Sequence, residues 1–215
     1  MSIITQIEDR IKSFGRGSIF YPDDFLDLGT SEAIRQSLTR LCKDEKIVRV
    51  AQGIYCYPQI DEELGLGIIM PTTDEIVRSL AKRDHARIVP TGSYAQHVLG
   101  LSTQIPLNCV YMTDGSARHL ELYNGRKITF KRTTPKNLSF TSKLAMLITF
   151  ALKSLGKMNI EQTVIKRIRE LLKNEPKNEV MKDLSLMPEW IRNIVTEAYE
   201  SLIPQHYNLT LFISS

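Results

Sequence analysis

The feature that most constrains the fold of this chain is an apolar period between positions 30 and 44. Apolar side chains recur there at four- and three-residue spacing, which places them on one helix face: Ile34, Leu38 and Leu41. Thr30 can cap such a helix by accepting a hydrogen bond from a backbone N–H of the first turn, and Glu32 complements the helix dipole. We therefore predict an amphipathic helix over 30–44.

Two short β-rich runs follow this helix closely. They span 47–50 and 54–57, and Ala51-Gln52-Gly53 separates them. Glycine readily takes the positive φ that a tight hairpin needs. The runs are therefore predicted to form a two-stranded ribbon, with Gln52 at or beside its tip.

The segment before the helix completes a characteristic order of elements. Positions 2–14 have a helical apolar period, 18–20 could form a short strand, and a second helix is predicted to start within 21–25, where a proline suits the first turn. The turn at 28–30 then leads into the third helix. Helix, short strand, helix, turn, helix and hairpin together predict a winged helix-turn-helix over 1–58.

The polar side of the 30–44 helix supplies candidate DNA contacts. Arg and Gln side chains can pair bidentately with guanine or adenine edges, and a hairpin beside the helix can reach phosphates or the minor groove. The predicted DNA-binding residues are Ser31, Arg35, Gln36, Thr39, Arg40 and Lys43 on the helix, with Arg49 and Gln52 on the hairpin. An ordinary solvated helix face would carry similar side chains, so the prediction rests on the elements around the helix.

The charge of the chain is unevenly distributed. Residues 1–58 hold eight Lys/Arg and eight Asp/Glu, whereas 116–177 hold fourteen Lys/Arg and four Asp/Glu, a net charge of +10. Such a basic region can bind DNA phosphates, RNA or an acidic protein surface, and it can also simply keep an apolar helical domain soluble. The predicted auxiliary basic surface consists of Arg126, Lys127, Lys131, Arg132, Lys166, Arg167, Arg169 and Lys173.

Beyond the winged helix the chain is predicted to contain a linker and a second domain. The linker spans 59–71 and is acidic at 61–63. In the second domain, 72–215, Asn124-Gly125 predicts a hairpin and the apolar segment 144–155 predicts a buried helix. The chain is thus predicted to be an α+β protein, with an N-terminal winged helix-turn-helix and a mixed α/β C-terminal domain that ends in helices.

No motif in the sequence predicts catalysis, a metal site or a cofactor. The cysteines, Cys42, Cys56 and Cys109, and the four histidines lack the spacing of zinc or redox sites. Gly92-Ser93 resembles the Gly-Ser of a nucleotidyltransferase, but no Asp-x-Asp follows to hold Mg²⁺, so this pair is predicted to open a helix. Without a signal-peptide core or a long apolar run, the protein is expected to be cytoplasmic and to make no membrane contact.

The segment 31–58 resembles the N-terminal domain of AbiEi-type antitoxins, which belong to type IV abortive-infection toxin–antitoxin systems. The shared strings are Ala33-Ile34-Arg35, Leu38-Thr39-Arg40-Leu41 and Gly53-Ile54-Tyr55. The likeness includes 11–20 and continues more weakly over 72–138, at Thr91–Ala95 and Leu99–Leu101. One departure is 43–46, Lys-Asp-Glu-Lys, where many members have a glycine, so the helix must end without a glycine cap.

The resemblance implies a transcriptional regulator that represses its own toxin–antitoxin operon by binding double-stranded DNA at inverted repeats near its promoter. Because a winged helix contacts a short half-site, two copies are expected to associate on the DNA. The resemblance also implies a functional partner, a nucleotidyltransferase-like toxin that is neutralised without a stable complex. The 72–215 domain would bind a partner or add phosphate contacts. The alternative is a protein-interaction module that keeps the fold without binding DNA, which the zero net charge of 1–58 favours.

Overall fold

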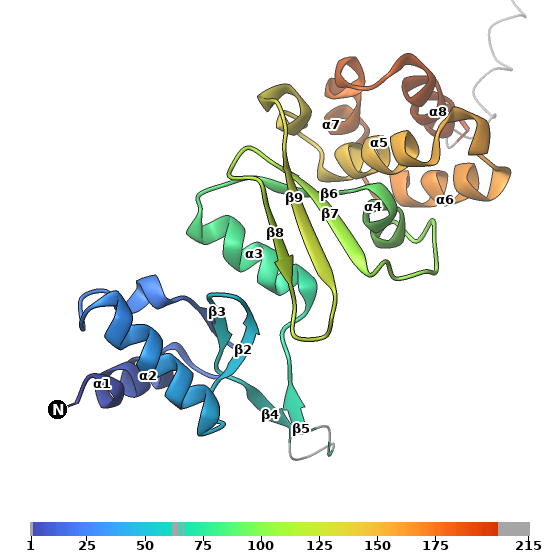
Figure 1. The fold of residues 1–215 in the computed structure, drawn as a ribbon. Coiled ribbons are helices and arrows are strands. Elements are labelled where there is room, and N and C mark those ends of the chain that lie inside the picture. The colour runs from blue at the N-terminus through green and yellow to red at the C-terminus, as the bar shows by residue number, and fades with distance from the viewer. Residues whose placement is uncertain (1, 62–64, 66, 202–215) are drawn as a thin grey trace, which may run out of the picture. The chain divides into compact units, whose positions relative to one another are not determined.

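The computed structural model describes residues 2–61, 65 and 67–201 (Figure 1). It combines helices with several small sheets, which confirms the predicted α+β class. The chain forms two compact units: one contains the positions up to Ala86 together with His119–Ile128, and the other contains Arg87–Arg118 together with the positions from Thr129 onward. Among the described residues, no helix is both long and apolar enough to cross a bilayer.

The N-terminal unit begins with the elements that the sequence predicts for a winged helix-turn-helix. In chain order they are α1 Ile3–Phe14, β1 Ile19–Phe20, the 3₁₀ turn η1 Pro22–Phe25, α2 Ser31–Lys43, β2 Val48–Ala51 and β3 Ile54–Cys56. The three strands form an antiparallel sheet in the order β1-β3-β2. The fold of 1–58 therefore follows the predicted order of elements.

The second helix of this order is shorter than the sequence suggests. Only Pro22–Phe25 is helical, as a 3₁₀ turn, and turns follow up to α2. The Asp24 carboxylate accepts a hydrogen bond from the Tyr21 N–H at 2.8 Å, which fixes the start of the turn. Aspartates and glycine are poor in helix interiors, and Asp23, Asp24, Asp27 and Gly29 crowd this stretch.

One apolar core holds the helices and the sheet of the N-terminal unit together. Its buried members are Ile7, Ile11, Phe20, Phe25, Ile34, Leu38, Leu41, Ile47 and Tyr55. The Phe20 and Phe25 rings meet edge to face at 5.8 Å, and Phe20 stacks on Tyr55 at 6.1 Å. Burial of each such side chain contributes roughly 1.5–3 kcal/mol. The apolar period of α2 points into this core and leaves the opposite side of the helix to solvent.

The predicted linker is an ordered ribbon where the structure describes it. Strands β4 Gln59–Asp61 and β5 Gly67–Ile69 pair antiparallel, with Ile60 opposite Ile68. Helix α3, Thr73–Arg83, follows the ribbon. Its N-cap is Thr72, which forms a reciprocal capping box with Glu75.

The N-terminal compact unit extends past the expected boundary at residue 58. The Tyr21 hydroxyl lies 2.8 Å from Ser79 Oγ of α3, and the Arg83 guanidinium lies over the Tyr21 ring at 4.3 Å. A hairpin from later in the chain also joins this unit, because the Tyr123 N–H donates to the Val50 carbonyl at 2.9 Å. Both differences arise from contacts between residues that are far apart in the sequence.

The second compact unit contains the central helix that the sequence predicts. In helix α5, Lys143–Leu155, every residue from 147 to 152 is buried, which agrees with the buried helix predicted from the apolar segment 144–155, while Lys143, Lys153 and Ser154 near its ends are exposed. The other helices are α4 Gly92–Val98, α6 Gln162–Leu172, α7 Lys177–Lys182 and α8 Glu189–Glu200, with 3₁₀ turns at Pro135–Leu138 (η2), Lys157–Asn159 (η3) and Leu184–Leu186 (η4). Helices α5 to α8 gather together in Figure 1, as predicted for a domain that ends in helices.

A four-stranded sheet completes the described fold, in the order β6-β7-β9-β8. Strands β6 Ile88–Thr91 and β7 Asn108–Thr113 pair antiparallel, with Ile88 opposite Thr113. Strands β8 Arg118–Glu121 and β9 Lys127–Arg132 flank the Asn124-Gly125 turn, where Gly125 has a φ of 76°. This turn confirms the predicted Asn-Gly hairpin.

Candidate nucleic-acid interface

Burial of the apolar face of α2 fixes the position of its exposed polar face. Ile34, Leu38 and Leu41 are at most 1% exposed, whereas all eight predicted DNA-binding residues are exposed. The helix begins at the predicted cap, since Thr30 Oγ1 accepts a hydrogen bond from the Ala33 N–H at 3.3 Å. The structure thus brings six of the eight predicted residues onto one solvent-facing helix.

Two of these polar side chains already have partners. Gln36 Nε2 donates to Glu32 Oε1 at 2.9 Å, one helical turn away. Thr39 Oγ1 donates to the carbonyl of Arg35 at 2.8 Å. A base contact by Gln36 requires its amide to leave Glu32, whereas the Thr39 hydroxyl can still accept a hydrogen bond while it donates to the backbone.

The end of α2 is defined without a glycine. Glu45 takes the left-handed conformation with a φ of 56°, which lets the Lys46 N–H donate to the Leu41 carbonyl at 3.0 Å and the Glu45 N–H to the Cys42 carbonyl at 3.1 Å. These two bonds form a Schellman motif, in which glycine usually occupies the Glu45 position. The turn directs Lys46 back toward α1.

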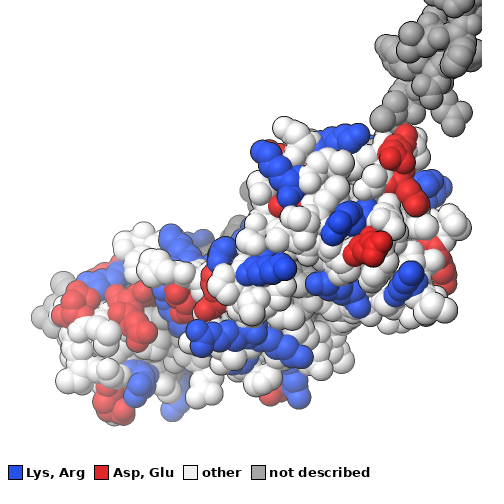
Figure 2. Space-filling view, turned by 90° about the horizontal axis from the view of Figure 1, so that it is seen from above, with Lys and Arg blue, Asp and Glu red and all other residues white. Residues whose placement is uncertain are grey.

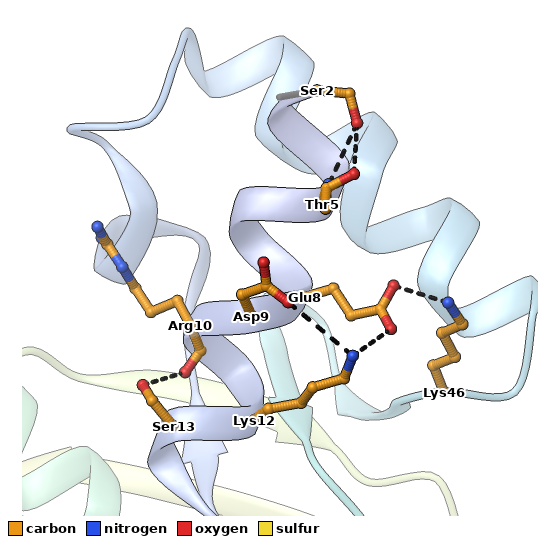
Figure 3. A network of polar contacts seen from close by, with 8 residues as sticks. All are labelled: Ser2, Thr5, Glu8, Asp9, Arg10, Lys12, Ser13 and Lys46. Carbon is orange, nitrogen blue, oxygen red and sulfur yellow. Dashed lines mark hydrogen bonds and ion pairs between the residues drawn. The ribbon is translucent and has the colours of Figure 1, made fainter.

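An ion-pair network occupies the α1 side of the unit (Figure 3). Glu8 lies between two cations, with its carboxylate oxygens 2.7 Å from Lys46 Nζ and 2.9 Å from Lys12 Nζ. Hydrogen bonds from Lys46 and then Lys12 hold the pKa of Glu8 below its ordinary value of 4.5. Arg10 forms a bidentate pair with Asp27, at 2.5 and 2.7 Å. Three of the unit's cations are therefore paired with acidic groups on this side.

The cations of α2 and β2 are arranged differently. Arg35, Arg40, Lys43 and Arg49 are all exposed, and the part of the chain that the structure describes offers no Asp or Glu oxygen within 4.0 Å of any of them. Although the net charge of 1–58 is zero, the ion-paired cations thus lie on the α1 side, and the cations without an acidic partner lie on the α2 side. An exposed cation that forms no ion pair can bind a DNA phosphate without first breaking a contact with an acidic side chain.

The β2–β3 hairpin places its arginine on the same side as α2. Arg49 is directly opposite Tyr55, so both project from one face of the sheet. Burial raises the pKa of Tyr55, while the positive charges of Arg49 and Arg35 oppose that rise. Tyr55 packs in the same core as the buried residues of α2, so Arg49 projects from the face of the sheet that packs against α2. The hairpin tip is the two-residue turn Gln52-Gly53, in which Gly53 has a φ of 70°.

The predicted auxiliary basic surface is divided between the two compact units. Arg126 and Lys127 belong to the N-terminal unit with α2, and the other six residues belong to the second unit. Arg167 is engaged within that unit, because its Nε donates to the Leu99 carbonyl at 2.9 Å and its Nη1 lies 3.4 Å from Glu170. Arg169 is half-buried. On the face drawn in Figure 2, Lys and Arg side chains lie among Asp and Glu.

The Gly92-Ser93 pair and Asp114, the first acidic residue that follows it in the sequence, both have structural roles. Asp114 accepts hydrogen bonds from the Arg87 N–H and Nε, both at 2.8 Å, and the Arg87 bond lowers the pKa of Asp114. Gly92, with a φ of 62°, opens α4 after the N-cap Thr91, as the sequence predicts for this turn. Within the described ranges, no group of three or more His, Cys, Asp or Glu side chains is placed to hold a metal ion.

Comparison with known proteins gives a family and a fold. The structure is similar to the crystal structure of the RV2827C protein from Mycobacterium tuberculosis, with a TM-score of 0.52, 13% sequence identity, and coverage of 93% of this chain and 76% of that chain. At this identity the likeness concerns the fold alone. No curated protein matches the sequence. A family model matches residues 6–180, and the chain therefore belongs to DUF6088, a family of unknown function.

Proposed function

We propose that this protein is a DNA-binding transcriptional regulator whose helix α2 enters the major groove. The observation that carries the proposal is the charge separation within the N-terminal unit. Lys12, Lys46 and Arg10 are neutralised on the α1 side, whereas the exposed cations of α2 and β2 have no acidic partner among the described residues. Cations without an acidic partner in the protein are free to bind phosphates, and the DNA backbone presents phosphates at regular intervals.

The residues of α2 and of the β2–β3 hairpin would make different kinds of contact with DNA. Arg35 and Arg40 reach base edges, since guanidinium groups can pair bidentately with guanine. Gln36 can contact adenine once it releases Glu32, and Lys43 near the end of the helix contacts phosphate. Arg49 adds a phosphate or minor-groove contact from the hairpin. Ser31, Thr39 and Gln52 carry hydroxyl or amide groups that can hydrogen-bond to the DNA backbone and so position the protein on it.

We further propose that the regulator is the autorepressing antitoxin of a type IV toxin–antitoxin pair. The support is the resemblance of 31–58 to the N-terminal domain of AbiEi-type antitoxins, in the strings that lie on α2 and on the β2–β3 hairpin. Its functional partner would be a nucleotidyltransferase-like toxin. A reading frame of that type beside the gene would support the antitoxin role, and co-expression should then relieve growth arrest by the toxin.

A second candidate function is that of a protein-interaction module. A pocket of about 210 Å³ lies in the N-terminal unit and includes Ile11, Leu41 and Tyr57 with the ribbon residues Ile60 and Ile68. Ile60 and Ile68 are 43% and 52% exposed, which is unusual for paired isoleucines. If the protein has no affinity for DNA, this apolar ribbon is where a partner should be sought.

A mobility-shift titration with the DNA upstream of the gene tests the DNA-binding proposal. The Arg35→Ala/Arg40→Ala variant should lose about 1–3 kcal/mol of binding free energy per arginine, which is roughly tenfold or more for each. Stability should change little, because both side chains are exposed and make no described ion pair.

The matched control is Arg78→Ala/Lys82→Ala, which removes two exposed cations from α3 of the same unit. Its affinity for the same DNA should stay within about twofold of the parent protein. Equal affinity of the α2 variant and the parent would refute the role of α2. Absence of binding by the parent itself would favour the interaction module.

A further inference from the structure

The wing formed by β2 and β3 is short and carries little positive charge. Its tip is two residues long, and Arg49 is the only cation in either strand. Strand β2 is the outer strand of the sheet order β1-β3-β2. An exposed outer strand offers unpaired backbone groups that other segments can join. In this protein the Val50 carbonyl on β2 accepts a hydrogen bond from the Tyr123 N–H at 2.9 Å.

The segment that occupies this edge is a compact turn with a fixed shape. The Leu122 N–H donates to the Arg126 carbonyl at 2.8 Å, and the Gly125 N–H donates to the Leu122 carbonyl at 2.9 Å. The Asn124 side chain accepts from the Arg126 N–H at 3.1 Å. Leu122 and Ile128 are 4% and 0% exposed, so the turn is anchored on both flanks. We call residues 119–128 the docked hairpin.

The tip of the docked hairpin is exposed and carries side chains of types that commonly bind phosphate. Tyr123 is 47% exposed, and Asn124 and Lys127 are exposed as well. Burial raises the pKa of Tyr123, and the positive charge of Arg126 opposes that rise. Neither Arg126 nor Lys127 forms an ion pair in the part of the chain that is described. Arg, Lys, Tyr and Asn side chains are the usual donors to phosphate and sugar.

We propose that the docked hairpin is a second wing, which binds the DNA backbone beside the segment contacted by α2. This inference rests on the proposed DNA-binding function and adds a site to it. The docked hairpin belongs to the same compact unit as α2 and is hydrogen-bonded to the outer strand β2 through Tyr123. Lys127 and Arg126 bind phosphates there and fix the register of α2 without selecting sequence.

The test measures how DNA affinity depends on salt in the full chain. Binding of the parent protein and the Arg126→Gln/Lys127→Gln variant is titrated at several salt concentrations, with the upstream DNA and with a mixed-sequence duplex of equal length. Each lost phosphate contact should reduce the slope of log K against log salt by about 1, and both DNAs should weaken alike. The control is Arg78→Gln/Lys82→Gln, which changes two exposed cations of α3 in the same compact unit.

Three outcomes decide the proposal. A slope reduced by about 2 in the Arg126/Lys127 variant, with the control unchanged, supports the second wing. An unchanged slope in that variant, while Arg35→Ala/Arg40→Ala still weakens binding, overturns the second wing and leaves the proposed function intact; the docked hairpin would then only protect the β2 edge. No binding by the parent protein overturns both.

The Tyr123→Pro variant provides an independent check. Proline has no N–H, so the bond to Val50 is lost while both cations remain. If docking positions the cations, this variant should also lower the salt slope, with its folding verified by thermal melting. A slope equal to that of the parent would contradict the proposal, because the cations would then act independently of their position on β2.

Discussion

The two sides of the N-terminal unit carry similar charged residues with opposite arrangements. On the α1 side, Glu8 holds Lys12 and Lys46, and Arg10 holds Asp27 in a bidentate pair. On the α2 side, Arg35, Arg40 and Arg49 have no acidic partner in the described structure. The net charge of a domain is thus a poor guide to nucleic-acid binding when the charges are segregated, because the phosphate backbone responds to the local surface.

The largest effect on stability should come from a substitution in the apolar core between α1 and α2. Leu38 is fully buried in α2, and Leu38→Ala should cost roughly 2–5 kcal/mol of unfolding free energy by leaving a cavity. DNA affinity should fall with it, since the α2 cations lose their support. Urea denaturation measures the cost, and Lys43→Ala, on the exposed side of the same helix, should stay within about 0.5 kcal/mol. A Leu38 variant as stable as the parent would contradict the described core.

The paired side should respond to pH in a way that the unpaired side does not. The pKa of Glu8 is lower in the folded protein than its ordinary value of 4.5, so its contribution is present above that value and is lost as the pH falls through the lower, folded pKa. Glu8→Gln should therefore lower the melting temperature at pH 7, with a cost of about 1 kcal/mol or less for a surface network. The difference should shrink as the pH falls through this lower pKa and vanish below it.

A matched change on the other side sharpens this comparison. Glu32→Gln removes an acid of α2 that is hydrogen-bonded to Gln36 and forms no described ion pair. Its melting temperature relative to the parent should depend less on pH than that of Glu8→Gln. An equal pH dependence of the two variants would show that the pairing described on the α1 side has no energetic consequence.

The smallest effect on stability should come from a substitution at Glu45, where α2 ends. Glu45 has a φ of 56°, a conformation that strains side chains with a Cβ, so Glu45→Gly should raise the unfolding free energy by about 0.5–1 kcal/mol. The same position after α4 is already Gly100, with a φ of 67°. Gly100→Ala should destabilise, because its Cβ would also lie 3.2 Å from the Arg167 guanidinium. Calorimetry of both variants tests this; a destabilising Glu45→Gly would contradict it.

Local patterns predicted the parts of the fold that depend on local interactions. The apolar period, the Thr30 cap and the tight Gln52-Gly53 turn together defined α2 and the hairpin. The Asn124-Gly125 turn was equally visible. The shortness of η1 was not predicted, because a proline and aspartates occur at the start of a longer helix as well as in an isolated turn. The end of α2 was also uncertain without a glycine, until the Lys46–Leu41 bond defined it.

Sequence alone determined that one helix has a buried side and a polar side, since the period of apolar residues is a local property. It also determined which residues are charged, and hence the zero net charge of 1–58. Only the tertiary structure decided which charges neutralise each other, because Glu8 and Lys46 meet through the packing of α1 on α2. It likewise brought Tyr123 to the edge of β2, a contact between residues more than seventy positions apart that no local pattern encodes.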